Sequence, residues 1–127
     1  MPNLKSTVGQ LGEEVAADFL KRNGLKIIEM NYKNRFGRRL GEIDIIAQDK
    51  NEFVFVEVKT RNFSTYQNTL PEENITRAKL HKLSKIANQY LYQNRLLDAS
   101  YRFDAISVWL DNNKKMAKIK HIRNIFL

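Results

Sequence analysis

The sequence predicts a small mixed α/β protein, and three patterns in its 127 residues support this prediction. Two stretches place apolar residues at helical spacing, and five shorter stretches rich in β-branched and aromatic residues are bounded by turn-forming residues. Their order is a helix, a three-strand meander, a second helix and two further strands. A helix between two strands serves as a crossover that makes them parallel, and such crossovers are nearly always right-handed. We therefore expect one mixed sheet flanked by helices, in a single domain spanning residues 1–127.

The first helix is expected at residues 8–22. Thr7 and Gln10 fit a capping box at its start, in which each side chain satisfies a free backbone donor of the other. Gly24, after Asn23, supplies the left-handed stop at its end. The predicted apolar stripe of this helix consists of Val8, Leu11, Val15 and Phe19.

Five strands and a longer helix complete the predicted order. The strands are expected at about residues 25–32, 41–48, 53–60, 101–110 and 116–122. A tight turn at residues 49–52 joins the second strand to the third, so these two strands form a hairpin. The second helix is expected at about residues 73–94, where its apolar stripe consists of Ile75, Leu83, Ile86 and Tyr90.

Composition and charge exclude several classes of protein. The chain has no cysteine, which excludes disulfides, thiolate metal sites and a cysteine nucleophile. No apolar run approaches the roughly 20 residues that cross a bilayer, and the N-terminus lacks the apolar segment of a signal peptide, so we expect a cytoplasmic protein without a membrane partner. The formal net charge of +8 favours a polyanionic partner, of which nucleic acid is the commonest. The alternative is that the charge only keeps the protein from aggregating.

The second and third strands are expected to bring two acidic side chains together. Because strand residues alternate between the faces of a sheet, Glu42 shares a face with Asp44, and Glu57 shares a face with Lys59. A hairpin closed by the turn at residues 49–52 pairs residues whose numbers sum to 101. Asp44 then lies across from Glu57, with Cβ atoms roughly 4.5–5.5 Å apart, and Glu42 lies across from Lys59.

This arrangement predicts a metal site. Two carboxylates this close repel each other unless a cation lies between them, and hard oxygen ligands suit Mg²⁺ or Mn²⁺. Lys59 is expected to reach the same place, where it would orient or help deprotonate a water and offset charge on a phosphate. Glu13 is the candidate third carboxylate, because Gly9 and Gly12 would let the first helix approach the sheet closely.

The competing interpretation is structural. Carboxylates on adjacent strands often face water, and Glu42 opposite Lys59 would form an ordinary cross-strand ion pair. The surroundings favour a functional site, because Asp44 and Glu57 stand among isoleucine, valine and phenylalanine residues, where an unpaired charge is costly.

Two motifs resemble a known family. Residues 41–47, Gly-Glu-Ile-Asp-Ile-Ile-Ala, and residues 55–61, Phe-Val-Glu-Val-Lys-Thr-Arg, resemble the YraN-like family of bacterial proteins. Residues 9–13, Lys79 and residues 102–104 resemble further motifs of that family, so the resemblance covers nearly the whole chain. The family is assigned to the restriction-endonuclease-like, PD-(D/E)XK fold, and it is similar to archaeal Holliday-junction resolvases and to the tRNA-endonuclease-like domain.

The resemblance implies roles for four residues. It makes Asp44 and Glu57 metal ligands, Lys59 the catalytic lysine, and Glu13 similar to the helix-borne acid of the resolvases. Ile43 stands where the name of the superfamily has a proline, a departure that many members share.

Several basic residues are candidate contacts to a nucleic-acid backbone. Arg61 directly follows the third strand, and its planar guanidinium suits phosphate. Lys79 falls within the apolar stripe of the second helix, where it either reaches the site or keeps its charge in water over a buried stem. The other candidates lie in the loop before the second strand, and they are Arg35, Arg38 and Arg39.

The remaining polar residues of interest have structural interpretations. His81 and His121 lack metal-ligand spacing and are interpreted as surface or edge residues. Asp104 is interpreted as the partner in a structural ion pair or turn. Tyr101, Phe103 and Trp109 are spaced like one side of a strand and are expected in the core.

The predicted function is a Mg²⁺- or Mn²⁺-dependent endonuclease that hydrolyses phosphodiester bonds in DNA, including branched or structured DNA. An enzyme of this kind is expected to form a homodimer with a two-fold interface so that it addresses two strands. Two alternatives remain open, namely a nucleic-acid-binding module of the same fold without turnover, and an RNA-directed nuclease.

Overall fold

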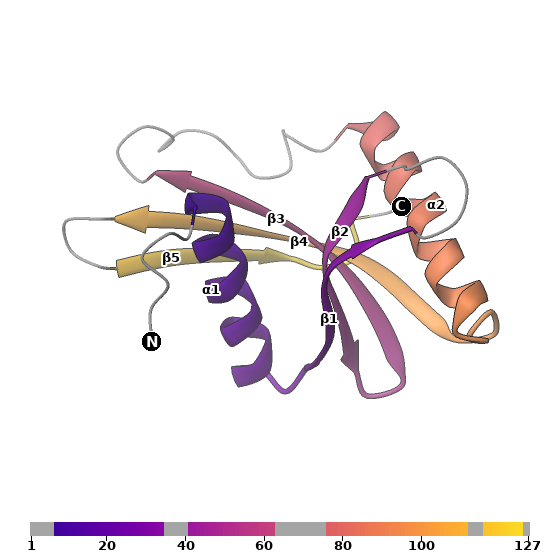
Figure 1. Cartoon of the computed structure of the whole chain (residues 1–127). Coiled ribbons are helices and arrows are strands. Elements are labelled where there is room, and N and C mark those ends of the chain that lie inside the picture. The colour runs from indigo at the N-terminus through magenta and orange to yellow at the C-terminus, as the bar shows by residue number, and fades with distance from the viewer. Residues whose placement is uncertain (1–6, 35–40, 63–75, 112–115, 126–127) are drawn as a thin grey trace.

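The computed structural model describes residues 7–34, 41–62, 76–111 and 116–125. The helices and strands of these residues are α1 (Val8–Arg22), β1 (Lys26–Lys33), β2 (Glu42–Asp49), β3 (Glu52–Asn62), α2 (Arg77–Gln93), β4 (Ser100–Asp111) and β5 (Met116–Ile122), and Figure 1 shows their arrangement. The predicted order of elements is confirmed. α1 and β5 have the predicted bounds, and the other strands begin and end within two residues of them.

The helix ends follow from their capping residues. Thr7 and Gln10 form the expected capping box at the start of α1, and Gly24 has the expected positive φ of 88°. α2 begins later than predicted, because Thr76 is extended and its side chain accepts a hydrogen bond from the backbone N–H of Lys79. Residues 73–75, also predicted to be helical, lie outside the described residues.

The sheet has the strand order β1-β2-β3-β4-β5. All neighbouring strands are antiparallel except β3 and β4, which are parallel, so α2 is the predicted crossover. The β2–β3 hairpin closes with Asp49 opposite Glu52, and its paired residues sum to 101 as predicted. Lys50 in the turn takes a left-handed φ of 57°. The hairpin register that the candidate site depends on is therefore confirmed for these pairs.

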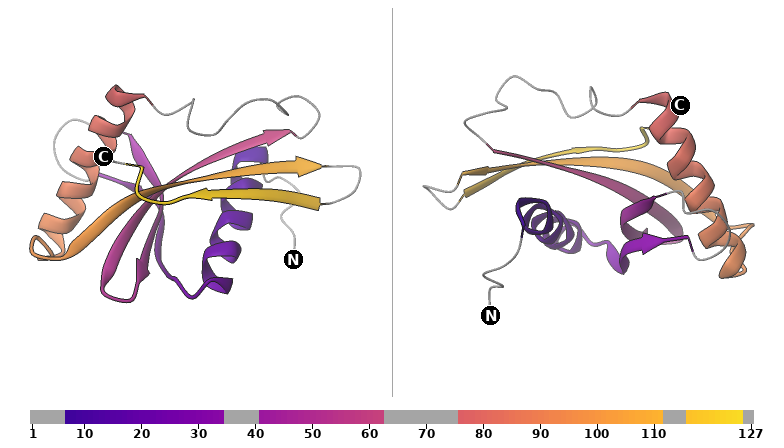
Figure 2. Two further views of the ribbon diagram at one scale, coloured as in Figure 1. Left: turned by 180° about the vertical axis from the view of Figure 1, so that it is seen from behind. Right: turned by 45° about the horizontal axis from the view of Figure 1, so that its top comes forward.

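The two helices cover opposite faces of the sheet. α1 packs over a cluster that includes Val56, Ile106 and Val108, whereas α2 packs over a cluster that includes Phe55 and Phe103. Figure 2 shows α1 against one face and α2 across the end of the other. Residues next to each other along β3 enter different clusters, and so do Phe103 and Ile106, three residues apart on β4, so these strands alternate regularly between the two faces.

The buried face of α1 differs from the predicted apolar stripe. The buried residues of this helix are Gly12, Ala16, Ala17 and Leu20. Val8 and Leu11 are 51% and 39% exposed, so the prediction was wrong for them. Small side chains form the contact because α1 lies very close to β3, and a Cβ added at Gly12 would come within 1.8 Å of Thr60 Oγ1. The close approach expected at Gly12 is confirmed, whereas the nearest atom to a Cβ added at Gly9 is Thr7 Oγ1 of the same helix end, at 3.8 Å.

The aromatic residues of β4 are only partly in the core. Phe103 and Trp109 are buried as expected, at 4% and 8% exposure. Tyr101 is 41% exposed, which contradicts the prediction, because it lies near the start of the strand.

A five-stranded mixed sheet with two helices is consistent with the restriction-endonuclease-like fold. Among the described residues, no helix combines the length and the apolar character that a bilayer crossing requires.

Candidate functional site

The candidate site lies where β2 separates from β3. The ladder between these strands runs from Asp49–Glu52 to Ile45–Val56. Asp44 follows the last pair, and its Oδ2 accepts a hydrogen bond of 2.8 Å from the backbone N–H of Val58. A side chain here takes a backbone donor that a continued ladder would have used, so the carboxylate of Asp44 is fixed in the opening between the two strands.

β2 departs from regular alternation at the same point. Ile43 and Ile46 pack into the same cluster beneath α2, although regular alternation would place residues three apart on opposite faces. The strand therefore turns between them, and this turn brings Asp44 near Glu13 on α1.

Three carboxylates converge at this opening. Glu13 from α1 and Glu42 and Asp44 from β2 each offer an oxygen atom, and these atoms lie within 4.8 Å of one another. Oxygen ligands on opposite sides of Mg²⁺ are about 4.2 Å apart, given Mg–O distances near 2.1 Å. The donor type and the spacing therefore fit a small divalent cation after a slight adjustment.

Glu42 was not among the predicted ligands. The sequence placed it opposite Lys59 as a possible ion-pair partner, but its carboxylate lies 4.0 Å from Lys33 Nζ instead. Its position two residues before Asp44 was the available signal. The prediction missed it because the ion-pair interpretation accounted for it equally well.

Glu57, which was predicted to be a metal ligand, is not among these three converging carboxylates; it lies beside them and contacts two lysines. Its Oε1 lies 2.5 Å from Lys79 Nζ and 3.4 Å from Lys59 Nζ, and Glu57 is only 6% exposed. Lys79 therefore reaches the site, which was one of its two interpretations, and does not direct its charge only to water. The structure brings the four predicted catalytic residues together with Lys79. Lys79 comes from α2, which covers the face of the sheet opposite to α1.

The surroundings of Asp44 and Glu13 disfavour the charged forms of their carboxyl groups. Burial raises the pKa of Asp44 to about 8, and the charge of Glu57 adds to the effect, whereas the N–H of Val58 opposes it. Burial also raises the pKa of Glu13, against a hydrogen bond from Asn31. A divalent cation would compensate this excess of negative charge.

The two lysines have opposite shifts. Burial lowers the pKa of Lys59, and its contact with Lys79 adds to the decrease. Burial also disfavours the charged form of Lys79, but its contacts with Glu57 and Lys59 and the negative charges of Glu57 and Asp44 together outweigh burial and raise the pKa of Lys79. Lys79 is therefore the fixed cation of the pair, and Lys59 is the lysine that more readily gives up a proton.

A pocket of about 350 Å³ opens next to the acidic group. It lies between the start of β2 and the first turns of α2, and Glu42, Lys79 and Lys82 are among its lining residues. Its two lysines and one carboxylate give it the mixed charge expected of a place that receives a phosphate near a metal.

The predicted phosphate contacts are only partly described. Arg61 is half-buried on β3, two residues after Lys59 and on the same face. Arg35, Arg38 and Arg39 lie outside the described residues.

The sequence predicted only part of a second cluster of charged residues, which lies buried around Asp104. Asp104 on β4 is completely buried and accepts hydrogen bonds from Arg102 Nε at 3.0 Å, His121 Nε2 at 2.8 Å and the backbone N–H of Asn124 at 2.9 Å. Its structural interpretation agrees with this geometry. His121 lies on the edge strand β5, as one interpretation expected, but it is not a surface residue, because its side chain is only 9% exposed and its ring packs edge-on against Phe19.

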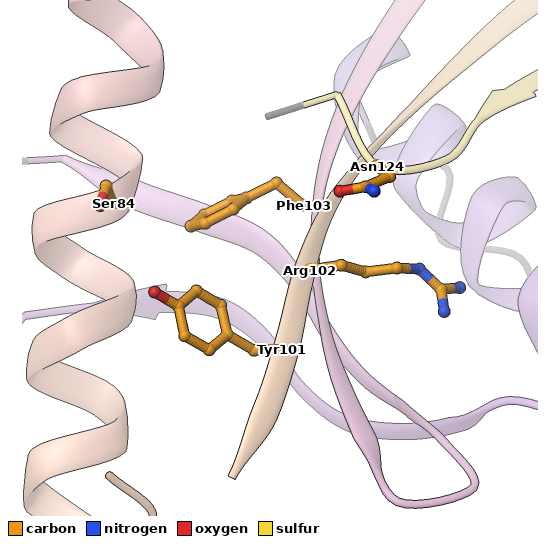
Figure 3. A pocket seen from close by; sticks show the side chains of 5 residues that line it. All are labelled: Ser84, Tyr101, Arg102, Phe103 and Asn124. Atoms are coloured by element: carbon orange, nitrogen blue, oxygen red, sulfur yellow. The ribbon is translucent and has the colours of Figure 1, made fainter. Parts of the chain in front are cut away.

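Burial would raise the pKa of Asp104, but the hydrogen bonds from His121 and Arg102 lower it below the ordinary value. Arg102 extends the cluster to Asp49 and Glu52. Figure 3 shows that the Arg102 side chain leaves β4 on the side away from α2, whereas Tyr101 and Phe103 extend toward the helix. The pocket of about 230 Å³ that these residues line with Ser84 and Asn124 contains no acidic side chain among its described residues.

Comparison with known proteins gives one consistent result. The family model described as "Uncharacterised protein family UPF0102" matches residues 12–108. A UPF0102 protein of Caldanaerobacter subterraneus subsp. tengcongensis is 42% identical over 123 residues, which cover 96% of each chain. A UPF0102 protein of Trichlorobacter lovleyi is 42% identical over 120 residues, covering 94% of this chain and 89% of the relative. A UPF0102 protein of Moorella thermoacetica is 39% identical over 118 residues, covering 93% of each chain. The family match includes every residue of the candidate site.

Proposed function

The chain belongs to the UPF0102 family, the YraN-like family that its motifs resemble, and we propose that it is a metal-dependent nuclease that hydrolyses phosphodiester bonds in DNA. The observation that carries this proposal is the convergence of three carboxylate oxygens within 4.8 Å, directly beside the Glu57–Lys59–Lys79 cluster. Acidic side chains whose like charges repel one another in a partly buried opening are typical of functional sites.

Asp44, Glu13 and Glu42 would hold Mg²⁺ or Mn²⁺, with Glu57 as the adjoining acid. The ion would supply Lewis-acid stabilisation of the phosphate under attack. Lys59 Nζ orients the attacking water and accepts its proton, a role that its lowered pKa favours. Lys79 Nζ keeps its positive charge, balances Glu57 and stabilises charge that develops on the phosphate oxygens.

The net charge of +8 supports a polyanionic substrate. DNA, including branched DNA, is the proposed substrate because of the resemblance to the resolvases. A two-fold homodimer would place two such sites against two strands. Light scattering that shows a monomer both with and without DNA would contradict the dimer and leave the chemistry of the site unaffected.

The test is a cleavage screen with Mg²⁺ and Mn²⁺ on duplex, single-stranded, flap and four-way DNA and on matched RNA. Wild type should cleave at least one DNA structure, and Asp44→Asn and Lys59→Met should each lower kcat by about 10²-fold or more. Lys26→Met is a matched control, because Lys26 is an exposed lysine at the start of β1.

The other outcomes select between the alternatives. Binding without cleavage of any substrate, unchanged in Lys59→Met, would replace the enzyme with a nucleic-acid-binding module. Cleavage of RNA alone would make the chain an RNA-directed nuclease.

A further inference from the structure

The part of the sheet beyond the candidate site carries a set of basic residues on one face. Ile106 and Val108 of β4 belong to the cluster beneath α1, so the residues that alternate with them, Ser107 and Trp109, point to the opposite face. Glu57 and Lys59 of β3 lie on this same opposite face, because Val56 and Val58 belong to the α1 cluster.

The strand register extends this face from β3 to β5. Lys59 pairs with Ser107, which pairs with Lys120, and Arg61 pairs with Trp109, which pairs with Lys118. Two rows therefore cross three strands, each with a cation at both ends. The rows are about 6.6 Å apart and the outer strands about 10 Å apart, from the spacings of residues and strands in a sheet.

The strand segments that carry Arg61, Lys118 and Lys120 extend away from α2, whereas Lys59 contacts Lys79 of that helix. Figure 1 shows that the ends of β3 and β4 and the beginning of β5 extend away from this helix. Lys118 and Lys120 are exposed, and Lys59 and Arg61 are half-buried. Outside the candidate site, the alternation of the described strand residues places one acidic residue, Asp111, on this face. The face, which we call the β3–β5 basic face (Lys59, Arg61, Lys118 and Lys120), therefore has a positive excess.

We propose that the β3–β5 basic face binds the phosphate backbone of a nucleic-acid duplex and directs one nucleic-acid strand of this duplex into the opening at Asp44 and Glu57. This inference rests on the proposed function, and it names the form of the substrate and the path it takes. The positive charge of the face complements a phosphate backbone, and the face is continuous with the candidate site because Lys59 belongs to both.

The burial of Trp109 favours a duplex over a single strand as the ligand of this face. Proteins that bind single strands combine positive charge with exposed aromatic rings on which bases stack. Trp109, in the middle of the basic face, is only 8% exposed, and Lys118 Nζ lies 5.9 Å from its ring centroid. The described part of this face therefore offers charges to phosphates without an open ring for a base. Contacts of this kind position a duplex without reading its sequence.

The experiment measures binding of labelled DNA by fluorescence anisotropy, with metal ions chelated, for the full chain and for the Lys118→Ala/Lys120→Ala double variant. The double variant should bind duplex roughly tenfold more weakly at low salt, and its log–log salt slope should be smaller by about 1.8, for two lost phosphate contacts. Duplexes of different sequence should lose affinity equally, and wild type should prefer duplex to a single strand.

The matched control is Lys21→Ala/Lys26→Ala, which removes the same charge at exposed positions on α1 and β1. Equal affinities and salt slopes for the two double variants would overturn the proposal, since the effect would then be one of net charge. Tighter binding of single strands than of duplex, or equal competition by polyglutamate, would also overturn it.

Failure of this inference is distinguishable from failure of the proposed function. If the chain cleaves nothing but Lys118→Ala/Lys120→Ala selectively loses duplex binding, the basic face stands and the nuclease assignment is wrong. If the chain cleaves duplex DNA and the double variant keeps both kcat and KM, the nuclease assignment stands and the basic face is wrong.

Discussion

Asp44 and Asp104 are aspartates on strands of the same sheet, yet their surroundings shift their pKa values in opposite directions. Asp104 is completely buried and accepts hydrogen bonds from Arg102, His121 and a backbone N–H, and its pKa is lowered. Burial raises the pKa of Asp44 to about 8, because the charges of other acids, Glu57 first, add to the effect of burial and the one backbone N–H that Asp44 accepts only partly opposes it. Burial alone therefore does not mark a functional acid. The mark is a carboxylate whose neighbours disfavour its charge, because a substrate or a cation must then compensate it.

The largest effect that this comparison predicts is on stability. Asp104→Ala should lower the free energy of unfolding by about 3–5 kcal/mol, because it leaves Arg102 without its buried partner. Chemical denaturation measures the loss directly. Asp104→Asn, which keeps the shape of the side chain, should lose less. A loss for Asp104→Ala no greater than that of an exposed substitution would contradict the structural role of this cluster.

The second prediction concerns metal. Mg²⁺ or Mn²⁺ at about 100 times its dissociation constant should raise the free energy of unfolding of wild type by about 2.7 kcal/mol. Asp44→Asn should lose most of this stabilisation, whereas Asp104→Asn should retain it, because only Asp44 belongs to the converging carboxylates. Thermal unfolding with and without metal measures both. Equal stabilisation of wild type and Asp44→Asn would show that the metal binds elsewhere.

The third prediction tests how α1 positions Glu13. Gly12→Ala should destabilise the protein by about 1–3 kcal/mol, because the added methyl group would come within 1.8 Å of Thr60 Oγ1 and must displace the helix. Glu13 would move with the helix, so the stabilisation by metal should also fall. Gly9→Ala is the matched control, because its nearest contact is Thr7 Oγ1 at 3.8 Å. The control should be neutral or slightly stabilising, and equal effects of the two substitutions would contradict the close approach.

The two acidic clusters also differ in how far the sequence predicted them. The site around Asp44 depends on one hairpin, and a turn at residues 49–52 fixes its register locally. The sequence therefore predicted that Asp44 and Glu57 lie close, together with the helix that brings Glu13. It did not predict that the ladder would stop at Ile45–Val56, because that depends on the hydrogen bond between Asp44 and Val58.

The cluster around Asp104 depends on contacts between distant segments. His121 meets Asp104 across the β4–β5 pair, and its ring also contacts Phe19 of α1, about a hundred residues earlier in the chain. No spacing rule connects these positions. The contact of α1 with β3 was predicted in part. The sequence predicted that Gly12 would allow a close approach, but it did not predict that Ala16 and Ala17 would lie on the buried face of the helix. Local register and the close approach at Gly12 were predictable, whereas partners from distant segments were not.

The smallest predicted effect is a difference in pH dependence without metal. Asp44 has a pKa of about 8 in the folded protein and an ordinary value of 3.8, so the folded state keeps a proton that the unfolded state loses in this interval. Its contribution to stability therefore falls as pH rises from about 4 to 8. Asp104 behaves oppositely, because its pKa is lowered in the folded protein. Its contribution to stability is complete above the ordinary pKa of aspartate and is lost as pH falls through the lowered pKa. Asp44→Asn should accordingly equal wild type near the acidic end of the interval and exceed it at its alkaline end by on the order of 1 kcal/mol, the equivalent of one pKa unit. Denaturation at a series of pH values measures the difference, and an Asp44→Asn variant less stable than wild type at the alkaline end would show that Asp44, like Asp104, is a satisfied structural acid.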